Sequence, residues 1–233
     1  MQTDAYKAGL FSALAVRAAF DNGMIAALRE HGIDATIGWD PTTVIEARLR
    51  KGDTADAIIV TDSAMKNMVD AGWVAARHCL PLVESSIGVA VKRGAPRPDI
   101  SSVQNFFDAL LKSRSVAYSL SGASGIYLQQ LLREHGHLEE INRRATPIDK
   151  GLVAERLVSG EADIAIQQIS ELSAVDGIDI VGPLPAEIQQ IVSLSVGICS
   201  ASVDRPVAHD LLKVLTSGYA KTIYERNGLT ARW

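Results

Sequence analysis

The spacing of apolar residues predicts a chain that alternates helices with short strands. Over residues 12–30, apolar side chains recur at three- and four-residue spacing, as at Leu14, Phe20, Met24 and Leu28, which predicts an amphipathic helix. Further helices are expected over 43–51, 63–71, 103–111 and after Gly125, and short apolar strands over 34–38, 57–60, 87–91 and 116–118. This alternation predicts an α/β fold with mainly parallel sheets.

A stretch of small residues, Ser121-Gly-Ala-Ser-Gly125, precedes one of these helices. A serine oxygen can accept an amide proton that the first turn cannot pair internally, so the stretch predicts a helix cap. The same exposed amides, together with the helix dipole, favour an anion at this place. The stretch by itself is compatible with a cap alone and with a cap that also contacts a ligand.

Two segments far apart in the chain share one plan. They are ARLRKGDTADAIIV (47–60) and ERLVSGEADIAIQQ (155–168). In each, a helix end is followed by a glycine (Gly52 or Gly160) suited to the left-handed position after a helix. An aspartate, Asp56 or Asp163, then precedes an apolar run of strand length. Such turns are common in α/β proteins, so coincidence is one explanation, and two lobes of like construction is the other.

Two long apolar runs, 86–92 and 191–199, stand where the chain would pass between two such lobes. The predicted domains are therefore a discontinuous lobe 1 of residues 1–88 plus 194–233, and lobe 2 of residues 89–193. Two lobes joined by two strands can close on a ligand in a cleft by a hinge motion.

Composition limits the function classes. The chain has 233 residues, of which 47% are hydrophobic and 21% charged, and its formal net charge is −4. These values are typical of a soluble globular protein, and the negative charge gives no electrostatic reason to expect nucleic-acid binding. No run approaches 18 uninterrupted apolar residues, so we expect no membrane insertion.

The first 20 residues, MQTDAYKAGLFSALAVRAAF, superficially resemble a signal sequence. However, Asp4 precedes the only early lysine, and the apolar part continues directly into the predicted helix, so we interpret the segment as folded chain. The expected location is cytoplasmic for the sequence as it stands, and periplasmic if a signal peptide has been removed.

Cysteine and histidine give no sign of a metal site. Cys79 and Cys199 lie far apart in apolar settings, and two buried thiols are favoured over one bridge. The five histidines form no metal-ligand spacing with cysteine or acidic residues. We therefore expect no metal and no cofactor.

Longer stretches carry a family resemblance that covers most of the chain. They are GDTADAIIVTDSAMKNMVDAG, ASGIYLQQLLREHG, LVSGEADIAIQQISEL, GIDIVGPLPAEIQ and LTSGYAKTIYERNGLT. In their order, they resemble the periplasmic molybdate-binding proteins and their wider relatives among the type II solute-binding proteins, which include enzymes of the aconitate isomerase type. The resemblance implies a two-lobed type II periplasmic-binding-protein fold with a ligand cleft between the lobes.

In that family, an oxyanion is held by neutral hydroxyls and backbone amides at helix N-termini, and a tyrosine contributes. The resemblance implies that the ligand-binding positions of this chain are Ser12 and Ala13, Thr42 and Thr43, Ser124 and Gly125, Lys150 and Gly151, and Gln168.

The carried-over positions depart from the family pattern. The family serine falls on Ala13, Thr42 replaces a serine, and Gln168 stands at the tyrosine position. A tetrahedral dianion needs a compact cage of donors, so these departures count against molybdate. The loops also have bulky or charged neighbours, which are Trp39, Asp40 and Lys150. Trp39 is equally explained by packing and Lys150 by a surface charge, but the set suits a larger organic anion at least as well as a metal oxyanion.

Two functions of different classes remain open. The first is binding of a small anion, an oxyanion or an organic di- or tricarboxylate, without chemistry; an exported receptor of this kind would have the membrane component of an ABC transporter as a partner. The second is an isomerase of an unsaturated di- or tricarboxylate, whose allylic proton shift needs a base near one carbon and an acid near another. The candidate catalytic residues are Lys150, Tyr118, Asp40 and Glu171, and for each of them a surface or structural role is the favoured explanation.

Overall fold

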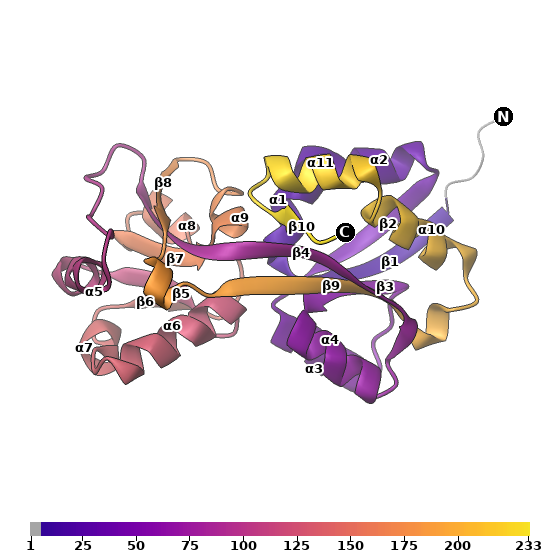
Figure 1. The fold of residues 1–233 in the computed structure, drawn as a ribbon, viewed down its shortest axis with the longest axis horizontal. Coiled ribbons are helices and arrows are strands. Elements are labelled where there is room, and N and C mark those ends of the chain that lie inside the picture. Colours follow the sequence, from indigo (N-terminus) through magenta and orange to yellow (C-terminus); the bar gives the residue numbers. More distant parts are fainter. Residues whose placement is uncertain (1–5) are drawn as a thin grey trace. The chain divides into compact units, whose positions relative to one another are not determined.

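The computed structural model describes residues 6–233, which divide into two compact units. Unit 1 is the chain up to Glu84 together with Ser193–Trp233, and unit 2 is Ser85–Val192. The chain leaves unit 1 along β4 (Val74–Lys92) and returns along β9 (Ile191–Cys199) (Figure 1). The predicted lobes were residues 1–88 with 194–233 and residues 89–193. Whether these ranges bound lobes that move on a hinge stays a prediction. Residues 1–5, where the segment interpreted as folded chain begins, lie outside the described residues.

Unit 1 is built on a parallel sheet in the order β2-β1-β3, extended by β9, which is antiparallel to β3. Its parallel strands are β1 (Tyr6–Ser12), β2 (Ile33–Trp39) and β3 (Ala57–Thr61). β10 (Thr230–Ala231) pairs with β4. Helices cover both faces of the sheet in Figure 1: α3 (Thr42–Arg50) and α4 (Asp62–Asp70) on one side, α10 (Pro206–Leu215) and α11 (Gly218–Arg226) on the other.

The first strand was not predicted. β1 lies between β2 and β3 and is buried from Leu10 to Ser12, so it lacks the alternation of a strand with one wet face. The helix expected over 12–30 is also interrupted. It begins at Leu14 and consists of short helical pieces, the last of which is α2 (Ile25–Glu30), because Gly23 has a φ of 151°. This left-handed position costs glycine little and other residues much.

Unit 2 repeats the parallel arrangement in the order β6-β5-β7, with β4 antiparallel to β7 and β8 antiparallel to β4. Its own strands are β5 (Val116–Ser119), β6 (Thr146–Ile148), β7 (Ile164–Gln168) and β8 (Ile178–Pro183). Its helices are α5 (Val103–Lys112), α6 (Ala123–Glu134), α7 (Leu138–Asn142), α8 (Glu155–Val158) and α9 (Ile169–Leu172). Ser102 caps α5, since its Oγ accepts from Asn105 N at 3.2 Å.

The two similar segments have the same structural role in their own units. Asp56 precedes β3, and its carboxylate accepts from Gly9 N of β1 at 2.8 Å and from Arg205. Asp163 precedes β7, and its carboxylate accepts from Arg114 N at 2.9 Å, just before β5, and from the Arg114 guanidinium at 2.8 Å. Both stop glycines have a positive φ, 94° at Gly52 and 79° at Gly160. In each unit, an aspartate thus fixes the start of one parallel strand to its neighbour.

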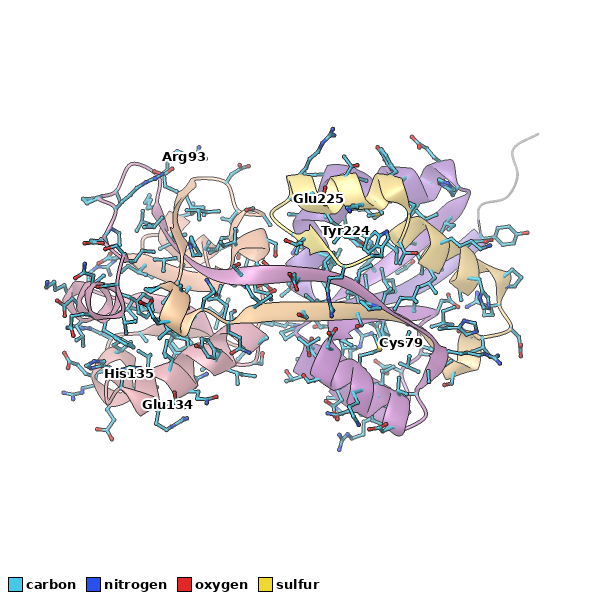
Figure 2. The ribbon with its side chains drawn as sticks, viewed as in Figure 1. Cys79, Arg93, Glu134, His135, Tyr224 and Glu225 are labelled. Carbon is cyan, nitrogen blue, oxygen red and sulfur yellow. The ribbon has the colours of Figure 1, made fainter. Side chains whose placement is uncertain are left out.

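Figure 2 shows the amphipathic character of α11, where Tyr224 and Glu225 are adjacent. Tyr224 is buried, and its ring centroid lies 6.1 Å from that of Trp233, whereas Glu225 is exposed. Burial raises the pKa of the Tyr224 hydroxyl, since a phenolate would lose its hydration there. Within residues 6–233, no helix combines the length and the apolar character that crossing a bilayer requires.

Both cysteines are free thiols, as predicted, but the predicted burial is confirmed only for Cys199 and is wrong for Cys79. Cys199 is buried in the core of unit 1, and Cys79 packs against the same cluster but is only partly buried. Burial raises the pKa of the Cys199 thiol to about 11, so it is protonated at neutral pH and acts as an apolar core residue.

Candidate functional site

The predicted site residues of unit 1 lie at the carboxyl edge of its parallel strands. Ser12 ends β1 and is paired in register with Trp39, the end of β2. The Asp40 amide donates to Ser12 O at 3.2 Å, and the Thr61 amide, at the end of β3, donates to Thr42 Oγ1 at 3.4 Å. The structure therefore brings the first two predicted loops together where parallel α/β sheets bind ligands.

The first loop has little donor capacity left. The Ala13 amide donates to Ile59 O at 2.8 Å, and its carbonyl accepts from Ser12 Oγ at 3.1 Å. Ser12 is fully buried. The second loop is more accessible, because Thr42 is half-buried and Thr43 is exposed in the first turn of α3. In unit 1, an anion would therefore meet the second loop more readily than the first.

Asp40 is paired with an arginine. Arg48 Nη1 lies 2.9 Å from Asp40 Oδ2, and Arg48 Nε lies 2.9 Å from Asp53 Oδ2. The guanidinium carbon also lies 3.8 Å from the centroid of the Phe11 ring. The hydrogen bond to Asp53, followed by the one to Asp40, raises the pKa of Arg48. This pairing offsets the Asp40 charge, so a role as a general base would first require the carboxylate to leave Arg48.

The N-terminus of α4 lies at the same edge of unit 1, and the sequence analysis did not identify it as part of the site. Thr61 Oγ1 and Ser63 Oγ lie 3.4 Å apart beside the start of α4. The intervening Asp62 accepts from Ser195 Oγ at 2.7 Å and from Arg232 Nη1 at 2.8 Å. The hydroxyls beside a helix start are the signal that could have found this place. Arg232 has no local signal, because it stands 170 residues away in the sequence.

The predicted residues of unit 2 also gather at the carboxyl edge of its parallel strands. Ser119 ends β5, Lys150 follows β6, and Gln168 ends β7. The Leu120 amide donates to Ile148 O at 2.8 Å, and Ser121 Oγ donates to Asp149 O. The third and fourth predicted loops are thus joined by hydrogen bonds.

The helix α6 begins at Ala123, three residues earlier than expected, with Gly122 as its N-cap. The predicted serine cap is wrong: no side chain caps α6, and Ser119 Oγ accepts the Gly122 amide at 2.9 Å instead. In the part of the chain that the structure describes, the amides of the first three helical residues, Ala123, Ser124 and Gly125, have no acceptor. Three open amides at the start of a 12-residue helix can bind an anion.

Gly125 has a packing reason to be glycine. A Cβ atom at this position would lie 1.7 Å from Ser119 O, a distance at which the helix and the strand end would have to separate. The missing side chain therefore brings the first turn of α6 against the end of β5. Ser124 beside it is also buried, with 1% of its surface exposed.

The loop after β6 is held by a buried glutamine that sequence reasoning did not identify. Gln167 Nε2 donates to Gly151 O at 3.2 Å, and Gln167 Oε1 accepts from Val153 N at 2.8 Å. Gly151 has a φ of 106°, which favours glycine. Lys150, one residue earlier, is exposed. The loop therefore presents a cation on a backbone that is fixed from inside.

Two buried groups at the end of β7 have unusual electrostatics. Gln168 is 5% exposed, and it forms a capping box with Glu171 at the start of α9. Glu171 is 7% exposed, and its Oε2 accepts from Gln168 N at 3.3 Å. Burial raises the pKa of Glu171 to about 7, although hydrogen bonds from Gln168 and Gln167 oppose the shift. This carboxyl group can both hold and release a proton near neutral pH.

Tyr118 is turned away from this chemistry. It is 2% exposed, and its hydroxyl donates to Asn142 Oδ1 at 2.5 Å. Burial raises the pKa of Tyr118, and the bond to Asn142 lowers it by less. No group of three or more histidine, cysteine, aspartate or glutamate side chains in the described chain could hold a metal ion. The two edges therefore present hydroxyls, helix amides and one lysine.

Comparison with known proteins identifies relatives of the chain. The model of the family described as "Bacterial extracellular solute-binding protein" matches residues 10–230. An aconitate isomerase from Pseudomonas sp is 38% identical over 191 residues, which is 82% of this chain and 72% of the relative.

Two solved structures resemble the fold at low sequence identity. The periplasmic molybdate-binding protein of Azotobacter vinelandii has a TM-score of 0.79 at 14% identity, covering 97% of this chain and 100% of that one. PEB3 of Campylobacter jejuni with bound L-phospholactate has a TM-score of 0.71 at 14% identity, again covering 97% and 100%. These likenesses confirm the predicted fold class.

Proposed function

The chain belongs to the bacterial extracellular solute-binding proteins, and from that premise we propose that it binds a small organic anion with two or three carboxylates. The observation that carries this proposal is the start of α6, where three open amides are joined through the 120–122 loop to the loop of Lys150. Helix amides stabilise one carboxylate, and a lysine can pair with a second one.

The side chain at the end of β7 favours an organic anion over a tetrahedral oxyanion. Gln168 stands where the resemblance implies a tyrosine, and its side-chain oxygen is a buried acceptor. An acceptor oxygen repels a fully ionised oxyanion but can accept from a protonated or hydroxylated ligand. The relative that shares 38% identity is described as an aconitate isomerase, which is consistent with a tricarboxylate ligand.

The test is a thermal-shift screen of molybdate, sulfate, phosphate, citrate, cis-aconitate and trans-aconitate. A ligand at 100 times its Kd stabilises the folded state by about 2.7 kcal/mol, which a melting curve detects. We expect a shift with at least one of the organic acids. A shift with molybdate alone would contradict the organic ligand, and no shift with any anion would contradict anion binding at these loops.

Lys150→Ala tests the placement of the second carboxylate. The variant should bind the selected acid about tenfold more weakly, since a charge-assisted hydrogen bond contributes roughly 1.5–3 kcal/mol. Lys112→Ala is the matched control, because Lys112 is an exposed lysine of the same unit and its side chain is 79% exposed. Equal affinities of the two variants would show that Lys150 is only a surface charge.

A second candidate function is isomerisation of an unsaturated di- or tricarboxylate, and two observations favour it. One is the 38% identical relative. The other is Glu171, the best supported of the four candidate catalytic residues, because a pKa of about 7 suits a group that must both accept and return a proton. In an allylic shift, a base removes a proton from one carbon, the double bond moves, and a proton is added at the far carbon.

Proton NMR of cis- and trans-aconitate with the protein in deuterated water tests this second function. Interconversion of the two acids, with deuterium entering the carbon that exchanges its proton, would support it. Glu171→Gln should then abolish turnover while binding persists. Tight binding of both acids without any interconversion would leave the receptor function as the better account.

The family description also bears on location and partners. Members are described as extracellular, which supports a location outside the cytoplasm rather than the cytoplasmic one. We therefore include the membrane component of an ABC transporter as the proposed partner of a receptor of this kind. Co-purification of the two from membranes in the presence of the selected acid tests this, and its failure together with observed turnover would favour the enzyme.

A further inference from the structure

A group of buried polar side chains surrounds the end of β7 in unit 2. Their exposed fractions are 2% for Gln167, 5% for Gln168, 0% for Ser170, 7% for Glu171 and 3% for Ser85. Burying polar groups costs free energy unless each one is hydrogen-bonded, and the cost is highest for a carboxyl group. A segment that served only packing would have apolar side chains here.

Glu171 is connected to both predicted ligand contacts on this side of unit 2. Its carboxylate accepts from the backbone amide of Gln168 at 3.3 Å and is hydrogen-bonded by Gln167. Gln167 in turn donates to Gly151 O at 3.2 Å and accepts from Val153 N at 2.8 Å. The Gln168 side chain accepts from the backbone amide of Glu171, which completes a capping box at the start of α9. One or two hydrogen bonds therefore separate the Glu171 carboxyl group from the residues that would contact the proposed ligand, so a change in its charge should affect them.

The surrounding charges do not fix the state of Glu171. The charged residues on the neighbouring elements of unit 2 are Lys92, Lys150, Glu155, Arg156, Asp176 and Asp179. Several have other partners: Arg156 pairs with Glu161 at 2.8 Å, Lys92 Nζ donates to Val158 O at 3.2 Å, and Asp179 accepts from Gly94 N at 3.1 Å. Burial is the largest influence on the Glu171 pKa, which is about 7, and hydrogen bonds from Gln168 and Gln167 are the others.

We propose that Glu171 takes up a proton when an organic anion binds beside Gln168 and the 150–151 loop, so that Glu171 is a positioning residue that couples binding to pH. This inference rests on the proposed binding function. A negative charge nearby disfavours the carboxylate and favours the carboxylic acid. The protonated group also gains an O–H donor beside the side-chain oxygen of Gln168, with which it forms the capping box of α9. Protonation thus removes a repulsive charge from this buried cluster.

Isothermal titration calorimetry with trans-aconitate, in imidazole and in bis-Tris buffers, measures the protons exchanged on binding. From about pH 6 to about pH 8, the wild-type protein should take up as much as about one proton per acid bound, after correction for the titration of the acid itself. Its affinity for trans-aconitate should fall by up to about tenfold per pH unit above neutrality, because binding then requires a proton from a solution in which the proton concentration is lower.

Glu171→Gln is the test variant, because glutamine keeps the size and an acceptor oxygen but cannot titrate. It should bind trans-aconitate with no linked proton and with little change in affinity over the same pH range. Glu155→Gln is the matched control, an exposed glutamate of the same unit, and it should retain the wild-type linkage. A role in capping α9 alone would not produce this difference.

A measurement on the wild-type chain avoids dependence on the variant. With glutamate labelled by carbon-13 at the carboxyl carbon, one resonance should titrate near neutral pH, and trans-aconitate should move its midpoint upward. Binding without proton uptake and without this shift would overturn the inference but leave the proposed binding function intact. If neither trans-aconitate nor any other acid of the screen binds, both fall together.

Discussion

Gln167 Oε1 accepts a hydrogen bond from the Val153 amide at 2.8 Å, and both residues are buried. The opposite end of the same side chain donates to Gly151 O, so one glutamine replaces the backbone pairing that the loop lacks. Gln167→Leu should lower the free energy of unfolding by about 1–3 kcal/mol, because it leaves a buried amide and a carbonyl without partners. Urea denaturation followed by circular dichroism measures this.

The same variant should also weaken ligand binding, because the backbone of the 150–151 loop would no longer be fixed. Gln167→Glu separates the two bonds: it keeps the acceptor for Val153 and loses the donor to Gly151. We expect it to bind the selected acid more weakly than wild type, and to be less stable at neutral pH, because it also buries a second carboxyl group beside Glu171. An unchanged affinity in Gln167→Leu would contradict a role of this loop in binding.

Gly125→Ala should be among the most damaging small substitutions in unit 2. The new Cβ would lie 1.7 Å from Ser119 O, a backbone atom that cannot rotate away, so the first turn of α6 must shift. Overpacking of this kind typically costs about 1–3 kcal/mol or more, and displacing the α6 amides should also weaken anion binding. Gly218→Ala is the control, since nothing lies within 4 Å of a Cβ there. Equal melting temperatures of the two variants would contradict the close approach.

Most of the secondary structure was predictable because most elements have a clean apolar period. Strands β2 and β3 and helices α3, α4 and α5 match the predicted ranges to within about two residues. β1 was missed because it is an inner strand that is buried along its second half. β4 was predicted too short, as the apolar run at 87–91, because the first half of this strand is only partly buried and has no continuous apolar run. Periodicity reports burial, so it reports least where burial is uniform or intermittent.

The sequence was enough to predict which loops form the candidate site, but not which hydrogen bonds and ion pairs their residues make. The resemblance indicated the loops that the structure gathers at the carboxyl edge of each unit. It gave no sign that the Ala13 amide is used by Ile59, or that Arg48 pairs with Asp40. Gln167 was invisible for the opposite reason. In the sequence it is an unremarkable residue of an apolar strand, and its role depends on a loop that starts 16 residues earlier.

The matched aspartates of the two units should differ in their effect on stability. Asp56 and Asp163 make the same two kinds of bond, but the side chain of Asp56 is 2% exposed and that of Asp163 is 43% exposed. Asp56→Ala leaves the half-buried amide of Gly9 unpaired and should cost about 2–4 kcal/mol. Asp163→Ala should cost about 1 kcal/mol or less, since water can replace its bonds. Equal losses in the two variants would mean that burial does not determine how much these aspartate hydrogen bonds contribute to the free energy of unfolding.

Glu171 should make the stability of unit 2 depend on pH in a direction opposite to that of an ordinary paired carboxylate. Its pKa is raised from 4.5 to about 7, so the folded chain binds this proton more tightly than the unfolded chain does. The free energy of unfolding contributed by this group is therefore highest below about pH 4.5 and falls as the pH rises toward 7, by up to about 3 kcal/mol. Glutamine cannot ionise, so Glu171→Gln should become progressively more stable relative to wild type across that range. Urea denaturation at a series of pH values, followed by circular dichroism, measures the difference, with Glu155→Gln as the control that should follow wild type. If the curves of wild type and Glu171→Gln run parallel, Glu171 is ionised in the folded protein at the same pH as in the unfolded chain, and the buried carboxyl group does not hold its proton.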